Sequence, residues 1–240
     1  LEKLMSNISF HWPAGKACAI MVAENAIDKD ICELTISELK KYYSQIAAPG
    51  PTIGGVIPGI KSTMDISWSH AAMQSANVPT DKLDICENHI VEKLFLSIAK
   101  YKEEFKWLWD WVNIQDTGFR VQEYKKGIGF YREHIDGGMD DSDITKDRVL
   151  AAIIYLNDVE IGGETYFREH NLRVAAKTGS ICLFPTHWSY PHQGCLPISN
   201  DKWIISTFIQ NAVNYNETID DSQGKKEIIV SSTEMPKKND

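Results

Sequence analysis

The chain has 240 residues, of which 43% are hydrophobic and 24% are charged, and its formal net charge is −8 at pH 7. This composition is ordinary for a soluble globular protein and excludes a fibrous chain or one too polar to fold. The negative charge disfavours capture of nucleic acid, because phosphate binding requires a basic surface, and no apolar run approaches the roughly 20 residues that span a bilayer. We therefore expect neither a nucleic-acid nor a membrane partner.

The five cysteines are scattered along the chain and form no CxxC pair: Cys18, Cys32, Cys86, Cys182 and Cys195. A chain of this length does not need disulfides to fold, so we expect reduced thiols and a cytoplasmic or cytosol-like location. The spacing also disfavours a zinc ribbon, so a metal would have to be bound by histidines and carboxylates. The chain starts at Leu1 rather than at Met, which is compatible with a removed leader or a late start.

The N-terminal half predicts mainly helices. Residues 17–23 form a short apolar run that is compatible with a strand, and apolar residues between 30 and 46 recur at helical spacing. A longer helix is predicted after Pro79, with Thr80 as its N-cap, because apolar residues advance three or four at a time as far as Leu108.

Residues 48–60, between these two helices, are dense in Gly and Pro. Neither a helix nor a regular central strand tolerates this composition, so the segment is predicted to be a loop. Long loops in compact domains are often functional, and two interpretations stay open: a mobile lid over a substrate or a passive connector.

After about residue 118 the pattern changes from helical spacing to short strands separated by Gly, Pro, Asn and Asp. The predicted strands are 120–125, 130–134, 148–156, 164–167, 172–175, 180–184 and 203–213. Many short strands of this kind indicate a sandwich or barrel. We therefore predict an α+β fold with one domain over residues 1–213, in which helices within 28–113 support a β-core over 118–213, followed by a polar tail over 214–240.

A His-x-Asp pair follows the second of these strands. Alternate residues of a strand project to the same face, so His134 and Asp136 are expected to point to one side. An imidazole and a carboxylate are two members of the 2-His-1-carboxylate set that Fe(II) oxygenases use. Because the tripeptide is common by chance, a surface ion pair before the Gly137-Gly138 turn is the alternative for these residues alone.

Two downstream residues favour a metal site. His192 follows an apolar strand, as a second imidazole arriving from another strand would. Lys202 begins the apolar run that continues over 203–209, and a buried lysine is costly unless it meets an anion. Residues 155–167 add a strand, a turn with a Gly pair and a second strand, in which two backbones approach closely.

In this order the residues resemble the prolyl 4-hydroxylase-like branch of the Fe(II)- and 2-oxoglutarate-dependent dioxygenases, over about residues 20–213 and most densely over 120–210. The matching elements are Tyr124, Tyr131, His134, Asp136, Arg148, Tyr155-Leu156, Gly163-Glu164-Thr165, His192 and Lys202. The resemblance implies a double-stranded β-helix (jelly-roll, cupin-like) core. It also implies Fe(II), 2-oxoglutarate and O₂ as cofactors, with L-ascorbate as an optional addition.

The resemblance implies that His134, Asp136 and His192 bind the iron. His187 is the rival for the third position, and His192 is preferred because Lys202 then stands at the family's spacing of ten residues.

The resemblance further implies that Lys202 pairs with the distal carboxylate of 2-oxoglutarate, that Tyr155 hydrogen-bonds the same carboxylate and that Tyr124 lines the cosubstrate pocket. For both tyrosines an ordinary core position is the alternative. Residues expected to face the substrate are Tyr131, Arg148 and Phe208, the last standing where prolyl hydroxylases often have Trp.

The expected reaction is hydroxylation of a C–H bond, with formation of succinate and CO₂, on a prolyl residue in a peptide or protein. Three alternatives stay open. The substrate is a free amino acid or another small molecule; the protein is a cupin-like sensor that binds metal without turnover; or it is a zinc hydrolase built on the same three residues, which leaves Lys202 without a role.

Overall fold

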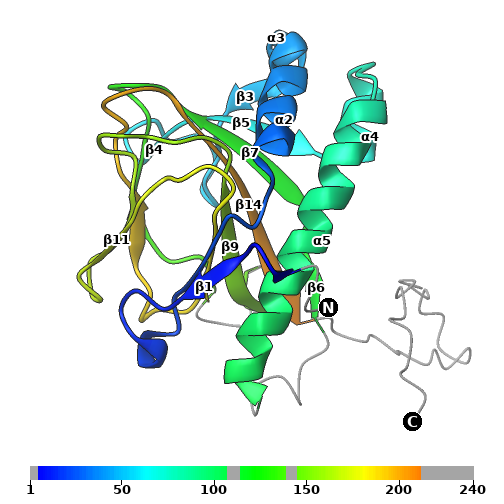
Figure 1. The fold of residues 1–240 in the computed structure, drawn as a ribbon. Helices are drawn as coiled ribbons and strands as arrows, with labels where there is room; N and C mark the ends of the chain where they lie inside the picture. Colours follow the sequence, from blue (N-terminus) through cyan, green and yellow to red (C-terminus); the bar gives the residue numbers. More distant parts are fainter. Residues whose placement is uncertain (1–4, 107–113, 139–144, 212–240) are drawn as a thin grey trace, which may run out of the picture.

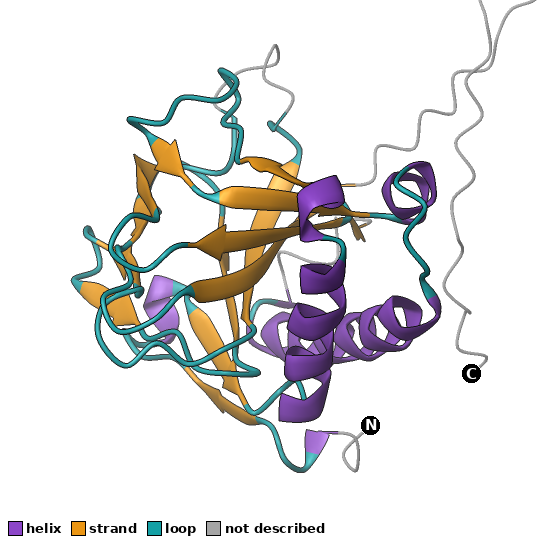
Figure 2. Cartoon of the chain, turned by 90° about the horizontal axis from the view of Figure 1, so that it is seen from above, coloured by secondary structure: helices purple, strands orange, loops and turns teal. Residues whose placement is uncertain are grey.

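The computed structural model of the chain describes residues 5–106, 114–138 and 145–211. Helices cover one face of a two-sheet β-sandwich, and the view from above separates the helical side from the sheets (Figures 1 and 2). Predictions for the end of the long helix (107–113) and for the tail (212–240) lie outside the described residues.

The helices lie mainly in the first half of the chain. They are η1 (Lys16–Cys18), α2 (Lys29–Lys41), α3 (Tyr43–Ile46), α4 (His70–Ser75) and α5 (Asp81–Glu104).

All the paired strands of the two sheets are antiparallel. The major sheet consists, in spatial order, of β1 (Ser9–His11), β2 (Met21–Glu24), β12 (Ile181–Pro185), β9 (Arg148–Tyr155), β14 (Lys202–Asn211), β7 (Phe119–Tyr124), β5 (Met64–Trp68) and β3 (Ala47–Pro49), and β6 (Ile114–Asp116) pairs with β14. The minor sheet consists of β11 (Leu172–Val174), β10 (Thr165–Phe167), β13 (His192–Gly194), β8 (Phe130–His134) and β4 (Lys61–Ser62). The α+β prediction is confirmed.

The major sheet separates two hydrophobic cores. On one face, Leu83 and Ile90 of α5 pack with Ile205 of β14. On the other face, Ile204 of the same strand packs with Phe184 between the two sheets. Successive side chains of a strand point to opposite faces, so β14 needs apolar residues on both, which explains its continuous apolar run.

The long helix α5 begins where the sequence predicts, directly after Thr80. Thr80 occupies the N-cap position without a side-chain hydrogen bond to the helix backbone, and its hydroxyl donates instead to Asp84 Oδ2 at 3.0 Å. The prediction of Thr80 as the N-cap residue is therefore confirmed. Acidic residues in the first turn, Asp81 and Asp84, complement the positive end of the helix dipole.

The Gly- and Pro-rich segment 48–60 is a loop that begins with the last residues of an edge strand. Pro49 closes β3 at the outer edge of the major sheet, where a missing N–H interrupts no central ladder. Its partner β5 is not among the predicted strands, because its cavity-side residues Asp65 and Ser67 are polar. Two short strands of the N-terminal part, β1 and β4, are likewise absent from the prediction.

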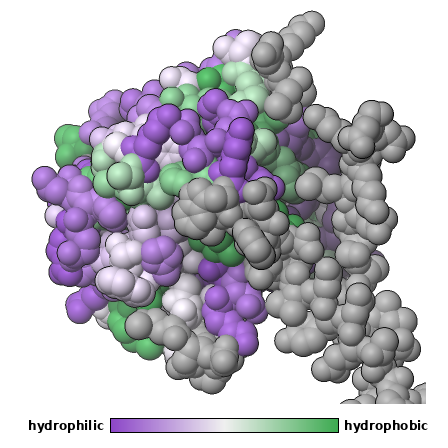
Figure 3. All heavy atoms as spheres, turned by 90° about the horizontal axis from the view of Figure 1, so that it is seen from below, coloured by the Kyte–Doolittle hydropathy of each residue, from purple (hydrophilic) through white to green (hydrophobic). Residues whose placement is uncertain are grey.

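None of the described helices is long and apolar enough to cross a bilayer. On the face shown in Figure 3, hydrophilic residues are interspersed with smaller hydrophobic areas. None of the five cysteines forms a disulfide.

Candidate active site

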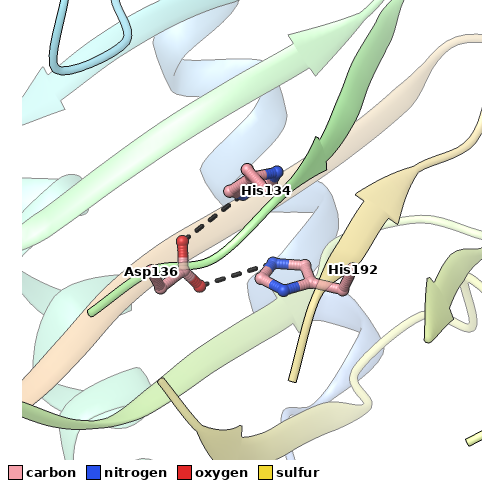
Figure 4. A group of neighbouring side chains, drawn as sticks. All are labelled: His134, Asp136 and His192. Carbon is pink, nitrogen blue, oxygen red and sulfur yellow. Dashed lines mark ion pairs between the residues drawn. The ribbon is translucent and has the colours of Figure 1, made fainter. Parts of the chain in front are cut away.

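Three residues from the minor sheet meet in the space between the two sheets. Asp136, just after β8, lies between His134 at the end of β8 and His192 at the start of β13 (Figure 4). One carboxylate oxygen, Oδ1, is 3.4 Å from His134 Nε2, and the other, Oδ2, is 3.4 Å from His192 Nε2. The strands bring them together because His134 and His192 are register partners in the β8–β13 ladder.

Both imidazoles are oriented by backbone carbonyls on their far side. His134 Nδ1 lies 2.8 Å from the Arg132 carbonyl, and His192 Nδ1 lies 3.1 Å from the Tyr190 carbonyl. A carbonyl oxygen only accepts, so each Nδ1 carries a proton, and Nε2 is the ring nitrogen that faces Asp136 in both cases. This outer contact is the one that metal-binding histidines usually make.

The electrostatics of the group also suit a cation. Burial lowers the pKa of His192 to about 4, so its ring is neutral at pH 7 and can act as a ligand. Burial alone would raise the pKa of Asp136, but the two imidazoles and Arg148 outweigh it and bring the value to about 2. The group therefore carries a carboxylate and a neutral imidazole at neutral pH, which are the ligand forms.

The spacing fits one shared ion better than direct hydrogen bonds. The two 3.4 Å separations exceed the usual range for hydrogen bonds, and the three ligand atoms lie within 4.8 Å of one another. Ligand atoms at right angles around one ion, with bonds of about 2.1 Å, are about 3 Å apart. Small movements would thus bring all three onto a metal. Another group of possible ligands, His70, Asp84 and Glu87, lies outside the cavity, with the His70 side chain 72% exposed.

The rival histidine is elsewhere. His187 Nδ1 contacts the Ser189 hydroxyl at 2.9 Å, and its ring packs edge-on against Tyr190. His187 is not part of the group around Asp136. The structure thus places His192, and not His187, beside Asp136, and the choice of His192 as the iron ligand stays a prediction.

Lys202 is buried beside this group, at the start of β14. Its side chain is 1% exposed, and Nζ donates to the Gly163 carbonyl at 2.9 Å and lies 4.1 Å from the centre of the Tyr124 ring. No carboxylate among the described residues forms an ion pair with it. Burial lowers the pKa of Lys202 to about 8, the direction expected when an ammonium group is removed from water.

A cavity of about 590 Å³ connects these residues. The predicted site residues that line it are His134, Asp136, His192, Lys202, Tyr124, Tyr131, Arg148 and Phe208. Tyr155 is not brought to the wall: it is fully buried, and its hydroxyl is 2.7 Å from that of Thr165, which does line the cavity.

Several residues that line the cavity were not predicted as site residues from the sequence. Gln122 lies next to Tyr124 on the same face of β7 and accepts a hydrogen bond from its hydroxyl at 3.1 Å. Gly194 lies against the Tyr124 ring, and Arg120 faces the cavity further along β7. Strand alternation from Tyr124 would have indicated Gln122 and Arg120, whereas Gly194 carries no such signal.

Residues 119–210 match the family model of the 2OG-Fe(II) oxygenase superfamily. The fold is similar to a viral collagen prolyl hydroxylase of Paramecium bursaria Chlorella virus 1 in its 2-oxoglutarate complex (18% identity, TM-score 0.59, covering 81% of this chain and 97% of that one). It is also similar to a Trichoplax adhaerens prolyl hydroxylase bound to a hypoxia-inducible-factor peptide (15% identity, TM-score 0.60, 82% and 85% covered) and to a Pseudomonas putida prolyl-4-hydroxylase (17% identity, TM-score 0.52, 82% and 95% covered). Among curated proteins none matches significantly. These likenesses confirm the double-stranded β-helix fold.

Proposed function

We propose that this chain, a 2-oxoglutarate- and Fe(II)-dependent dioxygenase with its oxygenase domain in residues 119–210, hydroxylates prolyl residues of a peptide or protein. The observation that carries the proposal is the cavity itself. It is lined by the buried His192 and Lys202 and also by exposed residues such as Ile53, Ser69 and Gly118, so it reaches the surface and leaves room for a chain. Prolyl hydroxylases of similar fold support the choice of substrate. We also propose that residues 1–213 form one domain.

In this proposal, His134, Asp136 and His192 would hold the iron through two imidazoles and one carboxylate, the ligand set that Fe(II) oxygenases use. When bound, iron and 2-oxoglutarate supply the chemistry that uses O₂ to hydroxylate the substrate and releases succinate and CO₂. The protein supplies the orientation: the Arg132 and Tyr190 carbonyls keep both Nε2 atoms directed at Asp136.

Lys202 binds the distal carboxylate of 2-oxoglutarate, and Tyr124 forms a side of that pocket. The Tyr124 hydroxyl is held by Gln122, and its ring faces the Lys202 ammonium. Because Thr165 lies between Tyr155 and the cavity, we place the Thr165 hydroxyl at the carboxylate and Tyr155 behind it, where it orients that hydroxyl. Direct contact of Tyr155 with the carboxylate stays a prediction of the sequence.

The substrate side is formed by Tyr131, Arg148 and Phe208. The Tyr131 ring stacks on His134, with centres 3.6 Å apart, and the Arg148 guanidinium lies 3.6 Å from the centre of the Phe208 ring. Arg148 also donates to the Asp136 carbonyl at 2.9 Å, so it is positioned by the iron site itself. Flat aromatic faces next to the iron suit the packing of a proline ring.

The test uses the Fe(II)-loaded protein with 2-oxoglutarate, O₂ and ascorbate. We expect proline-containing peptides to gain one oxygen atom on proline, measured by mass spectrometry, and to stimulate succinate release above the peptide-free rate. Hydroxylation of free amino acids with no reaction of any peptide would instead establish the small-molecule alternative. Metal binding without consumption of 2-oxoglutarate would contradict both.

The affinity for 2-oxoglutarate is expected to depend on pH through Lys202. The ammonium form binds the carboxylate, and its pKa in the free protein is about 8. The dissociation constant should be constant from pH 7 to about 8 and should then rise about tenfold per pH unit. Isothermal titration with Mn(II)-loaded protein checks this. Lys202→Arg should flatten the profile, since guanidinium stays charged; a wild-type profile that is also flat above pH 8 would contradict the assignment.

Gly194→Ala is expected to weaken 2-oxoglutarate binding without touching the iron. An added Cβ would lie 2.9 Å from Tyr124 Cε1 and 3.0 Å from its hydroxyl oxygen, so the ring must shift into the cosubstrate pocket. We expect the KM for 2-oxoglutarate to rise about tenfold and stability to fall by about 1–3 kcal/mol, as for other overpacked cores. The control is Gly59→Ala, where the added atom meets open space. Equal KM values for the two variants would contradict the prediction.

A further inference from the structure

A polar row crosses the floor of the cavity on the major sheet. Ser67 of β5 is the register partner of Arg120 of β7, which is the partner of Ser206 of β14. Partners in an antiparallel sheet project their side chains to the same face. Their chain neighbours Val121 and Ile205 pack against the helices, so the row faces the cavity, and all three residues line it.

The charge of Arg120 is only partly compensated. Its nearest carboxylate among the described residues is Asp65 Oδ2, 3.9 Å from Nη1, and its side chain is 45% exposed. Asp65 is already engaged, because Lys61 Nζ donates to Oδ2 at 2.7 Å and the Thr63 hydroxyl donates to Oδ1 at 2.7 Å. Lys61 and Arg120 therefore share the buried carboxylate of Asp65, and the Arg120 charge remains available on the cavity side.

The hydroxyls of Ser67 and Ser206 provide further hydrogen-bond donors beside the Arg120 guanidinium. Ser206 accepts from the Gln122 amide at 3.1 Å, while its own proton has only a long contact of 3.5 Å to the Arg120 carbonyl. Ser67 is exposed beside Arg120. A guanidinium between two hydroxyls is a set of donors that matches a carboxylate.

Among the described residues, most charged side chains that line the cavity are cationic, although the chain carries a net charge of −8. The described lining residues include the cations Arg120, Arg148 and Lys202, Lys61 in its ion pair with Asp65, and one carboxylate, Asp136. A low-dielectric cleft lined by one sign of charge attracts ligands of the other. A negatively charged substrate is therefore favoured over a neutral or basic one.

The polar row of Ser67, Arg120 and Ser206 is too far from Lys202 to bind the 2-oxoglutarate molecule that Lys202 binds. Ser206 is four residues further along β14 on the same face, which corresponds to about 13 Å at about 3.3 Å per residue. A free amino acid would carry its carboxylate a few bonds from the reacting carbon, nearer to Arg148, which contacts the Asp136 carbonyl. The distance of Arg120 suits a side chain of a longer substrate.

We propose that Arg120, flanked by Ser67 and Ser206, binds the carboxylate of an aspartate or glutamate that neighbours the target proline in the substrate peptide. This inference rests on the proposed prolyl hydroxylation and specifies its substrate as an acidic peptide. Arg120 acts here as a specificity residue and has no part in binding iron or 2-oxoglutarate.

The test measures equilibrium binding of two fluorescent proline peptides that differ only in Glu or Gln next to the proline. With the Mn(II)- and 2-oxoglutarate-loaded protein at low salt, we expect the Glu peptide to bind about tenfold more tightly. Arg120→Gln should remove this preference, and Arg120→Glu should transfer it to a Lys peptide. The control Arg168→Gln alters an exposed arginine outside the cavity and should keep it. Equal binding of the two peptides to the wild type would overturn the inference.

A second measurement separates this inference from the proposed function. Peptide-free succinate release should be the same in Arg120→Gln and wild type, and a loss there would assign Arg120 to the iron or cosubstrate site instead.

If the wild type hydroxylates the Glu and Gln peptides with equal kcat/KM, the proposed acidic subsite is wrong while the proposed prolyl hydroxylation stands. If N-acetylproline competes as strongly as the Glu peptide and its amide does not, the carboxylate belongs to a small molecule and the peptide assignment fails.

Discussion

His192→Ala is expected to abolish iron binding and hydroxylation, whereas His187→Ala should keep both. The alanine variant removes one of the Nε2 atoms that face Asp136 and leaves a carboxylate and one imidazole for the metal. Substitution of groups that only orient metal ligands already costs about 10–100-fold, so loss of a ligand should lower hydroxylation by more than about 100-fold. Anaerobic titration with Fe(II) and 2-oxoglutarate measures binding through the visible charge-transfer band.

His187→Ala is the matched control, because His187 lies five positions earlier in the same segment but contacts Ser189 and Tyr190. Its variant should develop the same band as the wild type. If His187→Ala lost the band and His192→Ala kept it, the assignment of the iron ligands would be wrong. If both variants kept it, the metal would bind elsewhere.

The second large effect is expected at Lys202. Lys202→Met should raise the KM for 2-oxoglutarate about 30-fold to 5,000-fold, because removing one partner of a buried charge pair costs about 2–5 kcal/mol. Metal binding should be retained, since Nζ contacts the Gly163 carbonyl and the Tyr124 ring rather than the group around Asp136. The measurements are succinate release at increasing 2-oxoglutarate and titration of the metal alone.

The thermal stability of the variant distinguishes a role of Lys202 in binding 2-oxoglutarate from a role in supporting the fold. In the free protein the Lys202 ammonium is buried with no ion pair to a carboxylate of the described part of the chain, and burial lowers its pKa. Replacing a buried charge by an apolar side chain of similar length is often neutral or stabilising. The melting temperature of metal-free Lys202→Met should therefore equal or exceed that of the wild type. A marked fall in Tm with an unchanged KM would show that Lys202 supports the fold instead.

Local patterns in the sequence were sufficient for the type of most elements in the β-core. Period-two alternation placed His134 and Asp136 on one side, and the double-sided apolar run of β14 follows from its position between two cores. The cost of burying a lysine already singled out Lys202 as a residue in need of an anion. These conclusions rest on neighbours along the chain, whose relative directions are dictated by backbone geometry alone.

Tertiary structure was needed wherever distant strands meet. The register of β8 against β13 places His192 rather than His187 beside Asp136, and the register of β5, β7 and β14 assembles the row around Arg120. The sequence also does not determine how far a side chain lies from the cavity surface. Tyr155 is on the cavity-facing side of its strand but lies behind Thr165. Sheet register and packing depth depend on contacts between residues far apart in the chain, and no periodicity along a single strand encodes them.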